Sequence, residues 1–384
     1  MTVFEPARGQ RVPVHLWARD ATDDTVRQLV RIASRPYVVG HVAAMADAHV
    51  AHGVAVGTVF ATDGAVVPRA LGGDLGCGVA ATRLDLHRDA LDRSTLERIV
   101  AALGRAIPTG DDVQRGGGAS MPEALLAGEL STSSLSRTRD RLTPKHLGTL
   151  GGGNHFLEID ADPDGDVWLL VHSGSRGVGA AVAAHHGKAA EALDPDPLAA
   201  LPADRPEGAR YLEDQGWSLA FARANRDALR DRAIEVLAGI LRVDVRALDH
   251  VDVHHNYVAR ETWSDRELIL HRKGAIAAPR GARAVVPGSM GTASYVVEGL
   301  GCALAWGSCS HGAGRVLTRT EARARIRPDA LARDMRRIVW PSHLGRKLVE
   351  EAPAAYRDIA EVLEAQGDLV ARIVRLVPLA VLKG

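Results

Sequence analysis

The sequence has few cysteines, few aromatic residues and no net charge. Its three cysteines, Cys77, Cys302 and Cys309, form no Cys-x-x-Cys pair among 384 residues, which excludes a zinc ribbon and argues against a disulfide framework. Aromatic residues make up only 4%, so a broad base-stacking surface is not expected. Lysine plus arginine and aspartate plus glutamate number 47 each, so any contact with nucleic acid must come from a local basic patch.

Several familiar binding and targeting signals are also missing. The chain has no P-loop and no Gly-x-Gly-x-x-Gly fingerprint, so a bound nucleotide must be held in a less common way. No apolar run approaches the roughly 20 residues of a membrane-spanning helix, and residues 1–6 do not begin a signal peptide. With the low cysteine content, this predicts a soluble cytoplasmic protein. The absence of a coiled-coil pattern or a large apolar stripe favours a monomer.

Hydrophobic residues make up 46% of the chain, which is enough for a sizeable core. Strands and helices do not alternate regularly, which predicts an α+β fold, with one domain over residues 1–384. The segment 192–210, rich in Pro, Ala and Asp, is predicted to be an exposed linker or insertion. The hydrophobic patterns predict helices at 23–33, 94–107, 218–241 and 355–375, strands at 54–61, 65–71, 79–86, 167–171, 267–271, 282–286 and 295–297, and a loop at 108–120.

Candidate metal ligands lie in glycine-rich settings. Asp74 and Cys77 occupy a tight turn before a strand, where a thiolate can bridge two cations and a carboxylate adds a hard oxygen ligand. A structural turn with a buried cysteine is the alternative. His172 follows the apolar strand 167–171 and precedes a Ser/Gly/Arg run, which suits a metal ligand with an anion site beside it.

Two further segments carry candidate histidine ligands. Asn154 and His155 follow three glycines, where the amide can donate to a phosphate oxygen while the imidazole binds metal. His254 and His255 are adjacent, so on a strand only one can face the site, and His255 is the choice. The histidine pair at 185–186 lacks such a setting and is predicted to lie on a solvated helix face.

The run 310–315, Ser-His-Gly-Ala-Gly-Arg, carries the candidate nucleophile. A neutral imidazole at His311 is a competent nucleophile near pH 7. Gly312 and Gly314 leave room for a bulky anion, and the guanidinium of Arg315 can hold it. With the metal ligands, this predicts a metal-assisted phosphoryl or nucleotidyl transfer site.

Other polar residues around the run have two interpretations each. Lys273 can balance phosphate charge or be an ordinary surface lysine, and Ser289 can bond a nucleotide or stabilise its Pro-Gly turn. Arginines gather after the nucleophile and form either an RNA-phosphate surface or a solvated helix with acidic neighbours. They are Arg315, Arg319, Arg323, Arg325, Arg327, Arg333, Arg336 and Arg337.

Taken in order, these motifs resemble the RtcB family of RNA ligases, from about residue 40 to the C-terminus. The matching segments are 74–78, 152–158, 172–177, 255–256, 272–274, 287–291, 311–315 and 383–384. The resemblance implies an RtcB-like fold of mixed, mainly antiparallel sheets flanked by helices. It also implies a GTP- and manganese-dependent ligase that joins RNA with a 3′-phosphate or 2′,3′-cyclic phosphate to RNA with a 5′-hydroxyl.

The resemblance also implies roles for single residues. Cys77 would bridge two manganese ions. Asp74 and His155 would complete one site, and His172 and His255 the other. Thiolate and imidazole ligands favour zinc on general grounds, so zinc is a possible substitute or inhibitor. The implied guanylylated nucleophile is His311; the implied nucleotide contacts are Asn154, Glu158, Ser289, Gly312, Ala313, Gly314, Arg315, Tyr356 and Lys383, and the implied RNA or phosphate contacts are Arg176 and Lys273.

Two other functions stay open at this point. A two-metal phosphoesterase would use the same metal ligands with a bound water, but would need neither His311 as a nucleophile nor Lys383. A non-catalytic protein that binds RNA ends would not need an intact set of ligands. For the ligase, an archease-like activator is a further partner that the resemblance implies.

Overall fold

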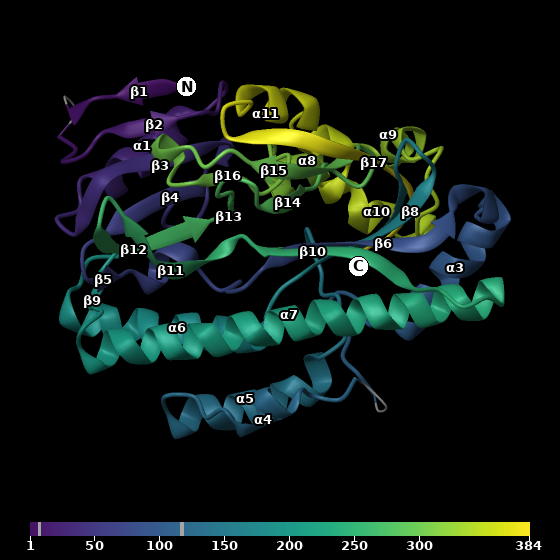
Figure 1. The fold of residues 1–384 in the computed structure, drawn as a ribbon, viewed down its shortest axis with the longest axis horizontal. Coiled ribbons are helices and arrows are strands. Elements are labelled where there is room, and N and C mark those ends of the chain that lie inside the picture. Colours follow the sequence, from purple (N-terminus) through teal and green to yellow (C-terminus); the bar gives the residue numbers. More distant parts are fainter. Residues whose placement is uncertain (7–8, 116–118) are drawn as a thin grey trace.

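Two large sheets and a layer of long helices make up the fold (Figure 1). The computed structural model describes residues 1–6, 9–115 and 119–384. One sheet has the strand order β1-β2-β3-β4-β12-β11, and the other has the order β10-β6-β8-β7-β17-β15-β14. Within the described residues, β2–β3 is the only parallel pair of named strands. The prediction of an α+β fold with mainly antiparallel sheets is therefore confirmed.

The elements of the described residues have these bounds. The helices are α1 Asp23–Ala33, α2 Pro68–Leu71, α3 Arg93–Ala106, α4 Glu123–Ala127, α5 Ser133–His146, α6 Arg176–Leu193, α7 Pro206–Leu241, α8 Arg319–Arg325, α9 Pro328–Asp334, α10 Gly345–Leu348 and α11 Ile359–Ala365. The strands are β1 Thr2–Phe4, β2 Val14–Leu16, β3 Val38–His49, β4 Val56–Thr62, β5 Ala65–Val66, β6 Gly78–His87, β7 Phe156–Ala161, β8 Asp166–Ser173, β9 Leu201–Pro202, β10 Ala247–His254, β11 Asn256–Trp263, β12 Arg266–Lys273, β13 Ala275–Ala277, β14 Arg283–Val286, β15 Ser294–Gly299, β16 Ser308–Ser310 and β17 Val370–Leu382.

Side-chain caps explain where several helices begin. The hydroxyl of Thr22 accepts a hydrogen bond from the Thr25 amide at the start of α1, and Asp92 caps α3 in the same way. At α8, Thr318 and Glu321 form a reciprocal capping box. Such caps satisfy amides that have no partner inside the helix, so the helices predicted at 23–33 and 94–107 begin at or next to their expected residues.

Five neighbouring strands of the larger sheet each have one terminus on the same side of the sheet. Strands β10, β6, β8, β7 and β17 are successive antiparallel neighbours. The register pairs His254 with Gly78, Gly78 with Ser173, and Phe156 with His172. The end of β10, the start of β6, the end of β8, the start of β7 and the end of β17 therefore meet, although they are far apart in sequence.

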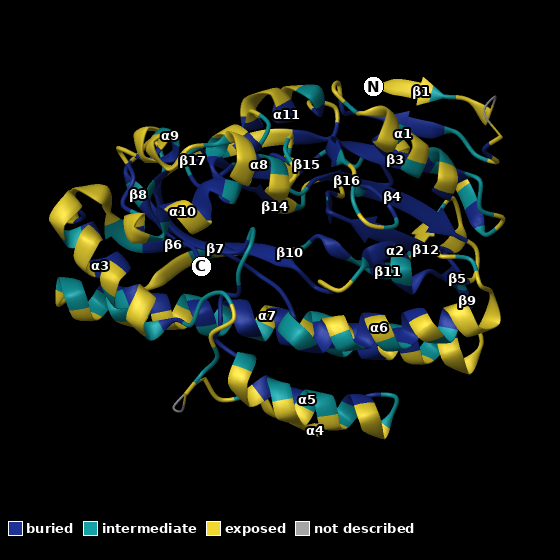
Figure 2. Ribbon diagram, turned by 180° about the vertical axis from the view of Figure 1, so that it is seen from behind, coloured by how far each residue is buried: buried dark blue, intermediate teal, exposed yellow. Residues whose placement is uncertain are grey.

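The long helices cover one face of this sheet. Helix α7 packs against β6 and β8, α6 lies beside α7, and α5 contacts α6 on the outer side (Figure 1). Figure 2 shows that the buried positions of α7 face the sheet, whereas α4 and α5 are largely exposed. Helix α7 begins at Pro206, earlier than the helix predicted at 218–241, since proline is well suited to the first turn of a helix.

Two element predictions are wrong. The helix predicted at 355–375 ends with the short α11, and β17 occupies 370–382 because Val, Ile and Leu dominate that stretch. Its Pro378 lies next to a register irregularity, where the missing amide is tolerated. The strand predicted at 65–71 stops at Val66, and a turn of helix starts at Pro68.

The segment 192–210 is anchored more firmly than a free linker. Its polar residues are largely exposed, but Leu198 and Leu201 are 1% and 0% exposed, and β9 pairs with β5. The loop predicted at 108–120 holds no helix or strand in its described part; 116–118 lie outside the described residues. Among the residues that the structure describes, no helix has the length and apolar character to cross a membrane.

Candidate metal centre and nucleotide cavity

The five candidate metal ligands converge at the common edge of the five strands. Cys77 directly precedes β6, His155 directly precedes β7, His172 lies near the end of β8, and His255 follows β10. Their ligand atoms form two groups in which all atoms lie within 4.8 Å of one another, and Cys77 belongs to both. The groups are Asp74, Cys77 and His155, and Cys77, His172 and His255. This is the division that the family resemblance implies.

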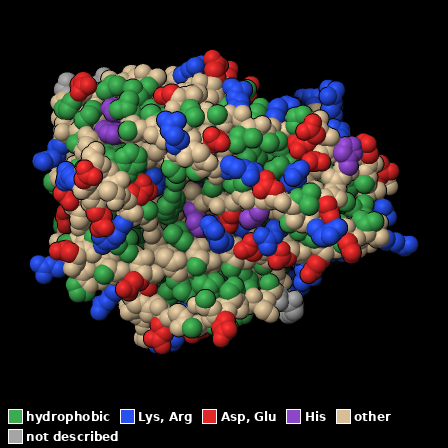
Figure 3. All heavy atoms as spheres, in the orientation of Figure 1, with side chains coloured by type: hydrophobic (Ala, Val, Ile, Leu, Met, Phe, Trp, Pro, Cys, Tyr) green, Lys and Arg blue, Asp and Glu red, His purple; other side chains and the backbone are tan. Residues whose placement is uncertain are grey.

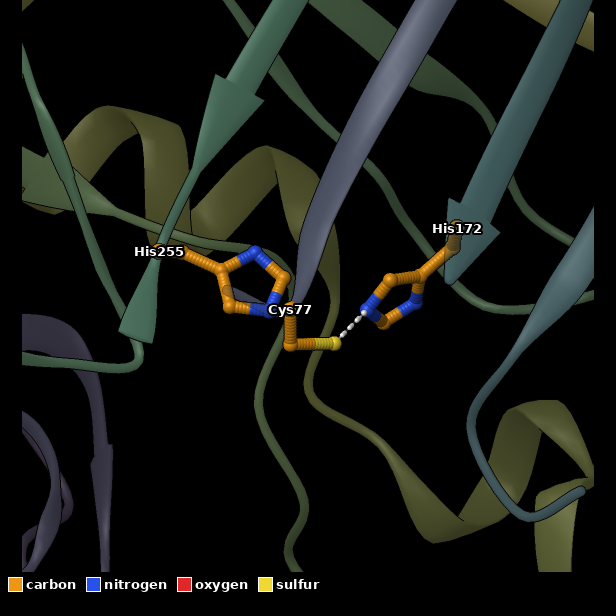
Figure 4. A group of neighbouring side chains, drawn as sticks. All are labelled: Cys77, His172 and His255. Carbon is orange, nitrogen blue, oxygen red and sulfur yellow. Dashed lines mark hydrogen bonds between the residues drawn. The ribbon is translucent and has the colours of Figure 1, made fainter. Parts of the chain in front are cut away.

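The Cys77 sulfur lies between the histidine side chains. Figure 4 shows it between His172 and His255, with the sulfur directed at the His172 ring. Its Sγ is 3.2 Å from Nε2 of His172 and 3.4 Å from Nε2 of His155, and that Nε2 is 3.4 Å from a carboxylate oxygen of Asp74. The three imidazoles, the sulfur and the carboxylate thus point into one small space, as the donors of a two-metal site would.

The electrostatics of the cluster suit metal binding. Burial, followed by neighbouring positive charge, holds the pKa of His172 and His255 well below 6.5, so both rings are neutral and keep a free lone pair. Nδ1 of His255 is buried and has no hydrogen-bond partner among the described residues, so its position is compatible with a role as a ligand atom. Desolvation would raise the pKa of Asp74, whose side chain is still 48% exposed, but its contact with His155 outweighs this and holds the pKa at about 2. The donor set therefore fits divalent cations.

The ring of His311 lies beside the metal cluster. It follows β16, and its centroid is 4.8 Å from that of His255. Its Nδ1 lies 2.7 Å from a carboxylate oxygen of Asp47, and its backbone amide donates to the same oxygen at 3.2 Å. The contact with Asp47 occupies Nδ1 and leaves Nε2 for other chemistry.

The Asp47 carboxylate is an unusual partner because its side chain is 0% exposed. Burial would raise its pKa, but the interaction with the His311 ring outweighs this and keeps the pKa below 3.8. Asp47 therefore stays ionised beneath the ring. Sequence analysis missed this residue; the signal was a lone carboxylate in the apolar run 42–48 of β3.

A cavity of about 760 Å³ opens over His311 and His172. Figure 3 shows histidine, basic and acidic side chains gathered along the middle of the face that it draws. Most of the predicted nucleotide contacts line the cavity, namely Asn154, Ser289, Gly312, Ala313, Gly314, Arg315, Tyr356 and Lys383. A volume of this size accommodates a nucleoside triphosphate.

One buried carboxylate links three of the cavity residues. Glu351 is 2% exposed, and its oxygens lie 3.1 Å from Nη1 of Arg315, 2.5 Å from the hydroxyl of Tyr356 and 3.3 Å from Nζ of Lys383. Burial would raise the pKa of Glu351, but neighbouring groups, the Lys383 charge first among them, outweigh this and lower the pKa below 4.5. Glu351 was also missed by sequence analysis; like Asp47, it has no glycine-rich motif around it.

Three predicted contacts are not among the described residues that line the cavity. Glu158 is buried on β7, where burial and then the charge of Asp160 raise its pKa well above 4.5. Arg176 begins α6, and its Nε donates to the Thr149 hydroxyl at 3.3 Å. The ammonium of Lys273 donates to two backbone carbonyls of the 52–54 segment, at 2.8 and 2.6 Å.

The arginines after His311 are mostly paired with acids. Arg319 lies at the cavity, 3.5 Å from Glu351, and Arg323 pairs with Glu350. Salt bridges also hold Arg325, Arg327 and Arg333, to Glu321 or Asp329. The interpretation as a solvated, ion-paired surface describes these three, whereas Arg315 and Arg319 belong to the cavity.

In each of the two adjacent histidine pairs, 254–255 and 185–186, the two rings lie in different surroundings. His254 lies outside both ligand groups, with Nδ1 2.9 Å from the carbonyl oxygen of Gly76. His186 was predicted to be solvated, which is wrong: it is 2% exposed, and its Nε2 lies 2.7 Å from the Asp214 carboxylate on α7. Its partner His185 is partly exposed, so the pair straddles the edge of the helix interface.

Comparisons with known proteins agree with the geometry. The chain is 34% identical to the "RNA-splicing ligase RtcB" of Escherichia coli (strain K12), over 99% of this chain and all of that protein. It is 32% identical to the protein of the same name from Mycobacterium tuberculosis, over 93% of the chain, and 30% identical to the "tRNA-splicing ligase RtcB" of Pyrobaculum aerophilum, over 98%. The family model described as tRNA-splicing ligase RtcB matches residues 28–132 and 127–384, so the chain belongs to the RtcB family.

Proposed function

We propose that this chain is a GTP-dependent RNA ligase that joins a 3′-phosphate or 2′,3′-cyclic phosphate end to a 5′-hydroxyl end through a histidine–GMP intermediate. The observation that carries the proposal is the placement of His311. Its ring stands against the ionised Asp47 on one side and the His255 end of the metal cluster on the other, at the floor of a nucleotide-sized cavity. Family membership supports ligation as the reaction class.

The first step is attack by Nε2 of His311 on the α-phosphorus of GTP. A nitrogen–phosphorus bond forms, the bond to the bridging oxygen breaks, and pyrophosphate leaves with the electron pair. The ring gains positive charge as the bond forms, and the Asp47 carboxylate beside Nδ1 offsets that charge. Arg315 at the cavity wall can hold the phosphates, and Lys383 adds positive charge at the same wall.

The cluster around Cys77 would hold two manganese ions, with Asp74 and His155 on one and His172 and His255 on the other. Bound metal supplies positive charge that offsets the charge of the polyphosphate and assists pyrophosphate departure. Since thiolate and imidazole donors also suit zinc, zinc is expected to compete for the same ligands.

Two further transfers complete the proposed reaction. An oxygen of the RNA 3′-phosphate attacks the phosphorus on His311, the nitrogen–phosphorus bond breaks, and the RNA end carries GMP through a pyrophosphate linkage. The 5′-hydroxyl of the second RNA then attacks the 3′-phosphorus, and GMP leaves. A 2′,3′-cyclic phosphate must first be opened by water. These steps depend mainly on positioning and charge, which the cavity and cluster residues supply.

The proposal is tested by covalent labelling. The purified chain is incubated with manganese and GTP labelled at the α-phosphate, and the protein is examined for label that is lost in acid but stable in alkali. Wild type should carry the label, and His311→Ala should not. A ligation assay with a 3′-phosphate and a 5′-hydroxyl RNA follows, with 3′-hydroxyl RNA as the control substrate. A chain that never becomes labelled, yet hydrolyses phosphate esters, would instead be the two-metal phosphoesterase.

A further inference from the structure

Two neighbouring residues in the middle of α7 are buried and polar. Asn225 and Arg226 are both 0% exposed, and both donate hydrogen bonds to Ser173 at the end of β8. A buried guanidinium is costly to desolvate and usually persists only where all its donors have partners. Neither residue touches the cavity, so the steps described above do not account for them.

Arg226 joins three separate segments through one guanidinium. Its Nη1 donates to the carbonyl oxygens of Gly76 at 3.1 Å and Ser173 at 3.0 Å. Its Nε and Nη2 lie 2.8 and 2.7 Å from the carboxylate of Asp252, and Nη2 is 3.3 Å from Nδ1 of His254. Four of the five N–H groups thereby have an oxygen acceptor.

Each of these segments carries a ligand of one metal group. Gly76 immediately precedes Cys77, Ser173 immediately follows His172, and the strand with Asp252 and His254 is followed directly by His255. Cys77, His172 and His255 are the three members of that group. The guanidinium therefore ties together the backbone on which all three donor atoms depend.

The glycines around Cys77 make room for this arrangement. A Cβ on Gly78 would lie 3.0 Å from the guanidinium carbon of Arg226 and 2.3 Å from the carbonyl oxygen of Val253. Gly76 has a φ of +73°, and a Cβ there would meet Ala222 of α7 at 3.0 Å. The two glycines that flank Cys77 thus allow α7 to approach closely, and Gly76 also allows the turn before β6.

Asn225 does the same for the second metal group. Its Nδ2 donates to the Thr149 carbonyl at 3.1 Å and to the Ser173 hydroxyl at 3.0 Å. The Ser173 hydroxyl in turn donates to the Leu150 carbonyl at 3.0 Å, which lies 2.9 Å from Nδ1 of His155. This chain of contacts turns Nε2 of His155 towards Cys77 and Asp74.

We propose that Asn225 and Arg226 are positioning residues that set the geometry of the two-metal site from behind the sheet, through the backbone of its ligand segments. The inference rests on the proposed metal-dependent function. The inference goes beyond that function because it assigns part of the site's metal affinity to α7, a helix that contributes no ligand to either group.

Cobalt(II) alone, added to the full-length chain, tests this. Cobalt bound by a thiolate gives an intense near-ultraviolet band, so both affinity and geometry are read from one titration. Arg226→Lys keeps the charge but cannot reach all three segments, and it should weaken cobalt binding by about 10- to 100-fold and alter the band. Arg223→Lys is the matched control, because Arg223 is 55% exposed, lies 3.5 Å from the same Asp252 and should bind cobalt within about twofold of wild type.

Asn225→Ala is measured in parallel, with circular dichroism of the metal-free chain to establish folding. It should weaken binding at the Asp74–Cys77–His155 group even if Arg226→Lys fails to fold. Folded variants with wild-type cobalt affinity and spectrum, whatever their melting temperature, would show a purely structural role and overturn the inference. A wild-type chain without the cobalt band would instead overturn the proposed metal-dependent function.

Discussion

At the scale of single residues, the site depends on buried carboxylates as much as on its histidines. Asp47 and Glu351 are 0% and 2% exposed; Asp47 pairs with His311, and Glu351 binds both Arg315 and Tyr356. In a dry interior such a charge interacts strongly with its neighbour. The two acids therefore fix both orientation and charge at the cavity floor.

The role of Asp47 can be tested with Asp47→Asn, which keeps the shape of the side chain and removes its charge. Without that charge, the cationic ring that forms on His311 loses its partner, so the rate of labelling by GTP should fall by about 100-fold or more. The measurement is single-turnover labelling at saturating GTP. Asp368→Asn is the control, since that carboxylate binds the Trp17 indole at 3.0 Å instead. Unchanged labelling in Asp47→Asn would refute the role.

How far the sequence could predict these residues follows from where they lie. The motif residues Cys77, His155 and His311 stand in glycine-rich turns, which can be recognised from the local composition of the sequence. Asp47 and Arg226 lie inside a strand and a helix, where their only mark is a charge at a position that the hydrophobic pattern assigns to the core. A systematic search for charged residues at core positions would have found both.

At the scale of elements, strong local signals gave correct predictions and weak ones did not. Helix α1 has both a side-chain cap and an apolar face, and its predicted bounds hold. The stretch 355–375 contains Ala and Leu at helical spacing, but a valine-rich strand takes over after the short α11. Pairing of β17 with β7 and β15 decides the outcome there, and such long-range pairing is not visible in local periodicity.

The anchoring of segment 192–210 leads to a stability prediction. Leu201 is 0% exposed and packs in a core cluster with Tyr211 and Ile269, so Leu201→Ala should lower the free energy of unfolding by about 2–5 kcal/mol. Leu193 is the last residue of α6 and is 62% exposed, so Leu193→Ala should change the free energy of unfolding by less than about 0.5 kcal/mol. Urea unfolding followed by circular dichroism measures both. Equal, small effects would restore the picture of a free linker.

At the scale of the whole molecule, the site is a product of strand register. The candidate ligands run from residue 74 to residue 255, and no spacing rule in the sequence brings them together. Antiparallel pairing does so, because it returns the end of one strand to the start of the next at the same edge. The sequence alone supported the grouping only through the family resemblance, whereas the register supplies its physical cause.

A site built from several distant segments should also stabilise the whole fold when metal binds. Manganese that binds the folded chain but not the unfolded one adds about 2.7 kcal/mol at a concentration 100 times its dissociation constant. Thermal unfolding with manganese, and again after chelation, should show this as a reversible rise in melting temperature. Cys77→Ala should abolish the rise because Cys77 belongs to both ligand groups, His155→Ala should remove only part of it, and Cys302→Ala, outside both groups, should keep it. A full rise in Cys77→Ala would mean that manganese binds elsewhere on the molecule.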